Sequence, residues 1–393
     1  MIDRRMRDAT TMVQGGQGLN RDAEPLTTPI FETTTFIFEN ADEVKAYNEG
    51  RSKKFLYSRY GNPTVTAVEQ TIAALEGAES AMLFASGMAA TSTALLSLLR
   101  SGDEIVCSAA IYGGTLHLLH DLFPRFGIQA RFASLLELSQ PDRLIGERTK
   151  VLWFESPINP TLRCVDVALI AAACRRRGVI SIIDNTFASP VNQRPLTMGV
   201  DIVMHSVTKY LNGHSDVTAG ALAGPAALMN DLDNGRRKLG GVVDPHAAYA
   251  IGRGLKTLSV RVERHNANAM LVARWLEAQK GSRIEDVYYP GLESHPDHEL
   301  AKRQMAGYGG MLCVDVGGGQ ARAERFFDRL KVFRRAASLG GVESLCSLPL
   351  LTSQWGHTDA QLAAAGITRS MARLSVGLED PQDLIEDLDQ ALS

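Results

Sequence analysis

The fold is decided by two stretches, Val179-Ile-Ser-Ile-Ile-Asp184 and Asp201-Ile-Val-Met-His-Ser206-Val-Thr208-Lys209. Each is a short apolar run rich in β-branched side chains, which is typical of a strand buried inside a parallel sheet. The first run ends in a carboxylate, and the second ends in two hydroxyls and a lysine. Because ligands of open α/β sheets bind at the carboxyl ends of strands, we expect Asp184 and Lys209 to face one site.

An acid and a lysine at two such strand ends suit pyridoxal phosphate (PLP). This cofactor needs a lysine for its Schiff base, an acidic partner for its pyridinium nitrogen and hydrogen-bond donors for its phosphate. Each residue alone has a structural explanation, because a buried Asp is often only a hydrogen-bonding group and a Lys after a strand is often solvated. Together with the hydroxyls of Ser206 and Thr208, Asp184 and Lys209 predict a PLP site.

The same alternation of strands and helices runs along the first two thirds of the chain. We expect strands at residues 81–84, 104–107, 151–155, 179–184 and 201–205, with helices at 63–75 and 89–99 among those between them. This alternation predicts an α/β fold with a mostly parallel central sheet and crossover helices.

After Gly254 the pattern changes. A long helix is expected at residues 258–279, strands at 311–316 and 372–376, and a last helix at 381–392. These elements predict a smaller C-terminal α+β domain. The 393 residues are enough for two domains. We therefore expect an N-terminal arm at 1–60, a cofactor-binding domain at 61–255 and a C-terminal domain at 256–393.

Composition restricts the partners. The net charge is −3, and the densest basic run, Arg175-Arg176-Arg177, is placed to complement the end of a helix. No apolar run approaches the length of a membrane span, and residues 1–7 are not followed by the apolar core of a signal peptide. We therefore expect no nucleic-acid or membrane partner.

The cysteines and histidines show no metal-ligand spacing, so no metal site is expected. The five cysteines are scattered and form no CxxC pair, which favours a reducing, cytoplasmic location.

Several motifs resemble those of one known family. The string Ser206-Val-Thr208-Lys209-Tyr-Leu-Asn-Gly213-His-Ser-Asp216 is similar to the lysine motif of the Cys/Met-metabolism PLP-dependent enzymes. That family includes cystathionine γ-synthase, cystathionine γ- and β-lyases, methionine γ-lyase and O-acylhomoserine sulfhydrylases. The resemblance covers nearly the whole chain through six further motifs: Tyr57-Ser58-Arg59-Tyr-Gly-Asn62-Pro63-Thr64, Ser86-Gly87-Met88-Ala89, Glu155-Ser-Pro157-Ile-Asn159-Pro160, Asp184-Asn-Thr-Phe187, Ser338-Leu-Gly-Gly-Val-Glu-Ser and Arg373-Leu-Ser-Val-Gly-Leu-Glu-Asp380.

The resemblance implies a fold type I PLP-dependent transferase and a role for each matching residue. Lys209 would hold the cofactor and carry protons, Asp184 would pair with the pyridine nitrogen, and Tyr112 would stack on the ring and assist the leaving γ-substituent. The phosphate would be held by Gly87, Met88, Ser206 and Thr208, with Tyr57 and Arg59 reaching it from a neighbouring subunit. Arg373 would bind the substrate α-carboxylate, and Asn159 and Ser338 would line the site. The resemblance thus also implies a homo-oligomer, with a tetramer as the expected form.

Three positions depart from the subgroups of this family. Family members that act on cystathionine tend to carry a glutamate before the arm tyrosine and another before the Ser-Leu-Gly motif, where this chain has Leu56 and Ala337. Methionine γ-lyases carry a cysteine where this chain has Gly114. A distal ammonium group beside Leu56 and Ala337 would lack a counter-charge, which disfavours cystathionine as the substrate.

Four functions stay open at this point. The first is a C–S lyase that performs γ-elimination on methionine, homocysteine or cystathionine, and the second is a γ-replacement synthase that uses an O-acylhomoserine. The third is an aminotransferase, which the Ser-x-Thr-Lys string and the arm residues Tyr57 and Arg59 disfavour. The fourth is a binding protein that keeps only the fold, and the full set of polar site residues argues against it.

Overall fold

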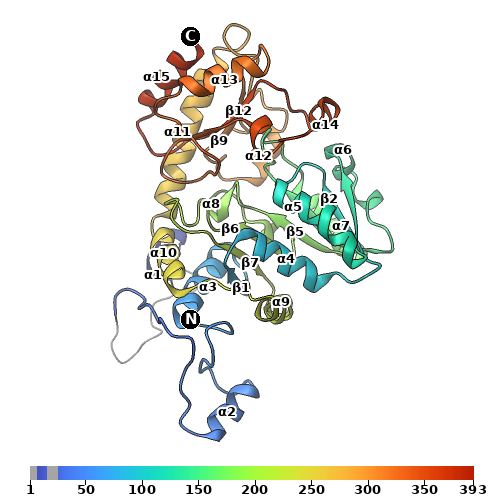
Figure 1. Ribbon diagram of the computed structural model, residues 1–393, viewed down its shortest axis with the longest axis vertical. Helices are drawn as coiled ribbons and strands as arrows, with labels where there is room; N and C mark the ends of the chain where they lie inside the picture. The colour runs from blue at the N-terminus through green and yellow to red at the C-terminus, as the bar shows by residue number, and fades with distance from the viewer. Residues whose placement is uncertain (1–6, 16–24) are drawn as a thin grey trace.

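The computed structural model describes residues 7–15 and 25–393, and within them the chain forms two sheets (Figure 1). The larger sheet has seven strands in the order β1-β7-β6-β5-β4-β2-β3. Neighbouring strands from β6 to β3 are parallel, and β7 is antiparallel to both β6 and β1. The strands are β1 (Ser80–Phe84), β2 (Glu104–Ser108), β3 (Gln129–Ala133), β4 (Thr149–Glu155), β5 (Ile180–Asp184), β6 (Ile202–Ser206) and β7 (Gly220–Gly224). The expected mostly parallel α/β sheet is confirmed.

Helices cover both faces of this sheet because its strands are apolar on both sides. One face packs against α4 and α9, and the other packs against α3 and α7. The helices of this region are α3 (Pro63–Glu76), α4 (Gly87–Leu98), α5 (Gly113–His117), α6 (Leu135–Leu138), α7 (Val167–Arg177), α8 (Ser189–Asn192), α9 (Ala226–Leu239) and α10 (Pro245–Leu255).

Local sequence signals set the ends of these helices. Asn62 caps α3 by accepting a hydrogen bond from the amide of Thr64, and Pro63 occupies the first turn. The helix α7 ends at Gly178, whose φ is +63°, and Arg175-Arg176-Arg177 form its last turn. The basic run therefore stabilises a helix C-terminus, as its position in the sequence predicts.

The second sheet has five strands in the order β10-β11-β12-β9-β8. It is built from β8 (Asp286–Tyr288), β9 (Met311–Asp315), β10 (Arg334–Arg335), β11 (Leu345–Ser347) and β12 (Met371–Ser375). Its helices are α11 (Leu258–Glu277), α12 (His298–Gln304), α13 (Gln320–Arg329), α14 (Asp359–Ala364) and α15 (Pro381–Leu392). One apolar core joins α3 and α10 through α11 to β9 and β12, so the two sheets are held together by continuous packing.

Some elements are absent from the sequence-based prediction. The strand β7 contains only Gly, Ala and Leu, which have weak strand propensity. Its glycines are required because a Cβ on Gly220 would lie 2.3 Å from the carbonyl oxygen of Ser86. The strand β3 lies at the edge of its sheet, and β8, β10 and β11 contain three residues or fewer. Such short pieces carry too little periodicity to be recognised.

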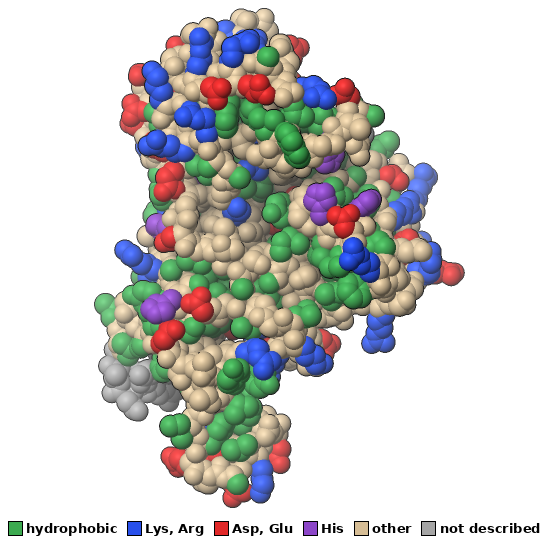
Figure 2. Space-filling view, viewed as in Figure 1, with side chains coloured by type: hydrophobic (Ala, Val, Ile, Leu, Met, Phe, Trp, Pro, Cys, Tyr) green, Lys and Arg blue, Asp and Glu red, His purple; other side chains and the backbone are tan. Residues whose placement is uncertain are grey.

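The N-terminal region contains two helices in its described part. The first, α1 (Asp8–Gln14), packs on the body, and Met12 is only 2% exposed. The second, α2 (Ala41–Asn48), lies at the tip of a segment that projects from the body (Figure 1). Hydrophobic side chains gather on this projecting segment in Figure 2, and Ile37 is 90% exposed.

On the face shown in Figure 2, acidic and basic side chains are interspersed. No helix in residues 7–15 or 25–393 is long and apolar enough to cross a membrane.

Candidate active site

The carboxyl ends of β5 and β6 lie side by side and carry the residues that the sequence singled out. The two strands are parallel neighbours, and Asp184 pairs in register with Met204. Asp184 is the last residue of β5, Ser206 is the last of β6, and Lys209 follows in the next turn. The amide of Lys209 donates to the carbonyl of Ser206 at 3.2 Å. The expectation that the acid and the lysine share one sheet edge is confirmed.

Thr186 fixes the carboxylate of Asp184. Both the amide and the hydroxyl of Thr186 donate to Asp184 Oδ1, the amide at 3.0 Å, and Thr186 Oγ1 accepts from the amide of Ser206 at 2.8 Å. Desolvation raises the pKa of Asp184, and the hydrogen bonds from Thr186 oppose this rise. Thr186 was not among the predicted site residues, although an Asp side chain commonly accepts from the amide two residues further on.

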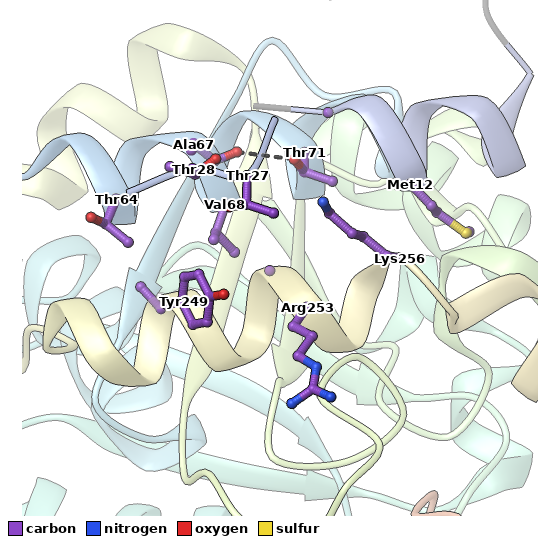
Figure 3. Close-up of a pocket in the computed structure, with 13 residues that line it drawn as sticks. Met12, Thr27, Thr28, Thr64, Ala67, Val68, Thr71, Tyr249, Arg253 and Lys256 are labelled. Atoms are coloured by element: carbon purple, nitrogen blue, oxygen red, sulfur yellow. Dashed lines mark hydrogen bonds between the residues drawn. The ribbon is translucent and has the colours of Figure 1, made fainter. Parts of the chain in front are cut away.

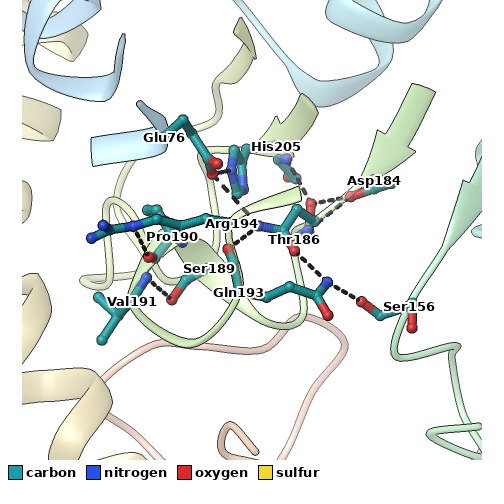
Figure 4. A network of polar contacts seen from close by, with 12 residues as sticks. Glu76, Ser156, Asp184, Thr186, Ser189, Pro190, Val191, Gln193, Arg194 and His205 are labelled. Carbon is teal, nitrogen blue, oxygen red and sulfur yellow. Dashed lines mark hydrogen bonds and ion pairs between the residues drawn. The ribbon is translucent and has the colours of Figure 1, made fainter. Parts of the chain in front are cut away.

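A buried network supports this edge from the opposite side of β6 (Figure 4). His205 and Glu76 are in contact and are fully buried. The side chain of Asn185 donates to the main-chain carbonyl of Gln193, and the side-chain Nε2 of Gln193 donates a hydrogen bond of 2.8 Å to the carbonyl of Ser156. These bonds connect α3, β6 and the segments after β4 and β5, so the strand ends are held rigidly.

Lys209 points to the C-terminal domain. Its Nζ donates to Ser338 Oγ at 2.7 Å. Burial and then the charge of Arg373 lower the pKa of Lys209 to about 8, and Asp184 opposes this change. A lysine with this pKa is partly neutral near physiological pH, which an amine needs in order to act as a nucleophile.

Arg373 joins Ser338 and Asn159 to the same cluster. It lies within β12, and its two terminal nitrogens donate to the Asn159 side-chain oxygen at 3.2 Å and to the Ser338 carbonyl at 3.0 Å. Burial lowers the pKa of Arg373. Ser338 has a φ of +102°, a strained conformation for a residue other than glycine. Strain of this kind persists where the surroundings hold a residue in a working position.

The N-terminus of α4 lies beside the end of β6. Ser86 caps the helix by accepting from the amide of Ala89 at 3.0 Å. A Cβ on Gly87 would lie 3.3 Å from the Cβ of Ser206, so the helix start and the strand end are in close contact. Free amides at a helix N-terminus bind phosphate well. Thr208 exchanges two hydrogen bonds with the main chain of Ala219, which holds the turn before Lys209.

Tyr112 precedes α5, and its side chain is 51% exposed. Its main-chain amide donates a hydrogen bond of 2.6 Å to Oε1 of Glu155, at the end of β4. Glu155 begins one of the motifs shared with the family but was not among the predicted site residues. Glu155 ends an apolar strand, as Asp184 does, so the same pattern could have identified it as a candidate site residue.

Tyr57 and Arg59 lie apart from this cluster. The guanidinium of Arg59 lies over the rings of Tyr57 and Tyr60, and its Nη1 donates to the carbonyl of Arg237 at 2.7 Å. Tyr57 is 39% exposed. Within the part of the chain that the structure describes, no hydrogen bond or ion pair connects either residue to Lys209, Asp184 or Arg373.

A separate pocket lies between α1, α3, α10 and residues 27–28 (Figure 3). Its lining includes Thr64, Val68, Tyr249, Arg253 and Lys256. None of the predicted site residues lines it, so it is not the site of the chemistry inferred above.

The site residues fit PLP. Asp184 offers a desolvated carboxylate for a protonated ring nitrogen, Lys209 offers an amine with a lowered pKa, and the start of α4 offers amides for a phosphate. These three groups gather around the same edge of the sheet.

The sequence is similar to known proteins over nearly its whole length. The sequence model of the family described as Cys/Met metabolism PLP-dependent enzyme matches residues 9–393. Cystathionine gamma-lyase of Mus musculus is 43% identical over 390 residues, which cover 98% of this chain and 94% of that protein. L-methionine gamma-lyase of Pseudomonas putida is 39% identical over 386 residues, 98% of this chain and 96% of that protein. Cystathionine gamma-synthase 1 of Nicotiana tabacum, a chloroplastic protein, is 40% identical over 388 residues, 98% of this chain and 72% of that protein.

The fold is also shared with a solved structure. The crystal structure of metB from Corynebacterium glutamicum superposes with a TM-score of 0.93 at 37% identity, covering 100% of this chain and 99% of that one. The family match extends over both sheets and over residues 9–14 of α1. It also supports an enzyme rather than a binding protein that keeps only the fold. The chain belongs to the Cys/Met-metabolism PLP-dependent enzymes, with the fold of the type I PLP-dependent transferases.

Proposed function

We propose that the chain is a PLP-dependent C–S lyase that performs γ-elimination on a sulfur amino acid such as methionine, homocysteine or cystathionine. The observation that carries this proposal is the contact of the low-pKa amine of Lys209 with Ser338, beside Arg373. The mouse and Pseudomonas relatives, whose names are those of γ-lyases, support it.

When bound, PLP would supply the electron sink that allows bonds at the substrate carbons to break. Lys209 would hold the cofactor covalently and later move protons as its amine is released. Asp184 would keep the ring nitrogen protonated, and Tyr112 would stack on the ring. The phosphate would be held by the amides of Gly87 and Met88 and by the hydroxyls of Ser206 and Thr208, the latter after its proton turns away from the carbonyl of Ala219.

Arg373 would bind the substrate α-carboxylate, with Asn159 and Ser338 orienting its guanidinium. We expect Arg373→Ala to raise KM by roughly 10- to 100-fold, because charged hydrogen bonds of about 1.5–3 kcal/mol are lost. The pKa of Lys209 should rise in the same variant, since Arg373 lowers it. Steady-state kinetics and the pH dependence of PLP capture by the apoenzyme measure these two effects. An unchanged KM would show that the carboxylate binds elsewhere.

The distal part of the pocket would be formed by Leu56 and Ala337, which carry no charge. Of the nearby acids, Glu343 accepts a hydrogen bond from the hydroxyl of Ser215 at 3.2 Å, and Glu32 contacts His246 at 3.2 Å. Beside Leu56 and Ala337, a zwitterionic tail would bury its ammonium group without a counter-charge.

Methionine or homocysteine should then exceed cystathionine in kcat/KM, and Ala337→Glu should shift the preference toward cystathionine. Competition assays with the three amino acids measure this preference. Ala336→Glu, at the adjacent exposed position, is the matched control and should leave it unchanged. A wild-type enzyme that prefers cystathionine tenfold or more would contradict this substrate assignment.

The alternative is a γ-replacement synthase that joins cysteine or sulfide to an O-acylhomoserine. Two observations support this alternative. The tobacco relative carries the name of a synthase, and the surroundings of Gly114 leave no room for a side chain at that position. A Cβ there would lie 2.5 Å from the ring of Tyr112 and 2.9 Å from the sulfur of Met88, so this loop cannot accept the cysteine of methionine γ-lyases unchanged. A product assay decides, because the lyase releases ammonia and an oxoacid from a sulfur amino acid alone.

We also propose that the enzyme is a cytoplasmic homotetramer in which Tyr57 and Arg59 complete the phosphate site of a neighbouring subunit. The exposure of Tyr57 and the projecting arm support the shared site. All five cysteines are free and buried, which fits a reducing compartment.

A further inference from the structure

Glu155 and Asp184 end two adjacent strands and are partners in register. Glu155 is only 5% exposed, and its Oε1 accepts the 2.6 Å hydrogen bond from the amide of Tyr112. The exposed residue Tyr112 is thus attached through its main-chain amide to the buried acid Glu155.

We propose that Glu155 is a positioning residue that holds Tyr112 in the site, and that it does so as an uncharged carboxylic acid. The inference rests on the proposed function, in which Tyr112 stacks on the cofactor.

The bond to Glu155 connects the main chain of Tyr112 to the sheet, whereas its carbonyl makes only a local bond, which it accepts from the amide of Leu116 at 3.1 Å. Gly113 and Gly114 follow directly and contribute no side chains, and α5 has no side-chain cap at its start. The ring of Tyr112 lies over Gly114, where even a Cβ would be only 2.5 Å from Tyr112 Cε1. A shift of the Tyr112 backbone would therefore move the ring directly.

Glu155 is the member of the acid pair that keeps its proton. Asp184 accepts two hydrogen bonds from Thr186, whereas Glu155 accepts one, from Tyr112, and forms no ion pair within the described residues. Two adjacent buried carboxyl groups do not both ionise, because their negative charges would repel each other and would lose their hydration. Burial and the neighbouring Asp184 raise the pKa of Glu155 well above its usual range. A neutral acid still accepts the amide of Tyr112 through its carbonyl oxygen.

Three substitutions separate position from charge. Glu155→Ala removes the acceptor, and Glu155→Asp keeps the acid but withdraws it from Tyr112. Both should lower kcat by on the order of 10- to 100-fold, as misplaced groups do, and should weaken the visible circular dichroism of bound PLP. Glu155→Gln keeps the shape without a charge and should restore most of both signals. The matched control is Glu104→Gln on β2, where Glu104 accepts from Thr149 at 2.7 Å away from the site.

A double-mutant cycle tests whether Glu155 acts through Tyr112. In a Tyr112→Ala background, Glu155→Ala should change kcat and the dichroism less than twofold, whatever it does to the melting temperature. Additive losses would overturn the proposal, and so would a Glu155→Gln variant as impaired as Glu155→Asp. A wild-type protein that binds no PLP and releases no product would instead refute the proposed function. An active wild type with a fully active Glu155→Ala would refute only the role of Glu155.

Discussion

Replacing Lys209 with alanine should lower kcat by on the order of 10³-fold or more, because in the proposed mechanism this one residue both holds the cofactor and moves protons. Borohydride reduction of the wild-type protein, followed by peptide mapping, should place the pyridoxyl group on Lys209. The variant should lose the visible absorbance of lysine-bound PLP and retain no label. The matched control is Lys150→Ala, which changes an exposed lysine near the start of β4 and should behave as the wild type.

The pH dependence gives an independent test of Lys209. Its pKa is lowered from 10.5 to about 8, so the neutral amine should appear with a midpoint near pH 8. An ordinary lysine would be neutral in only about 0.3% of molecules at that pH. The rate at which apoenzyme captures PLP should therefore rise through pH 8 and level off above it. Label on another lysine, or a midpoint near 10.5, would contradict the assignment.

Mixing two inactive variants should restore activity if the site is shared between chains. Arg59→Ala lacks the phosphate contact, and Lys209→Ala lacks the catalytic amine, but a mixed pair contains one site with both residues. In a two-fold dimer with random exchange, half of the pairs are mixed and one of their two sites is complete, so about a quarter of the wild-type activity is expected. The structure supports this arrangement, because Arg59 does not contact Lys209 within one chain and instead lies over Tyr57 and Tyr60.

The controls for this experiment separate a shared site from a damaged arm. Arg51→Ala changes another arm arginine, one that pairs with Glu49, and should remain active alone. Mixed oligomers can be verified by differently tagged chains purified in sequence. If verified mixed oligomers remain inactive, each site is built from one chain and Arg59 has no role across the interface.

The sequence by itself determined the α/β sheet, and it predicted that Asp184 and Lys209 lie at one edge of that sheet. The apolar runs at β4, β5 and β6 were recognisable because strands buried on both faces must be apolar throughout. The acid and the lysine were recognisable because they end two such runs. The strand β7 was not, because Gly and Ala have weak strand propensity, and Gly220 is required by the close approach of the α4 N-terminus.

The contacts between distant residues were decided only by the tertiary structure. Lys209 meets Ser338 across 129 positions of sequence, and Arg373 meets Asn159 across 214. Residues so far apart are brought together by the packing of α11 and the second sheet on the first, which no local pattern encodes. The pKa of Lys209 and the pairing of Glu155 with Tyr112 follow from the same packing, because desolvation and register depend on which strands become neighbours.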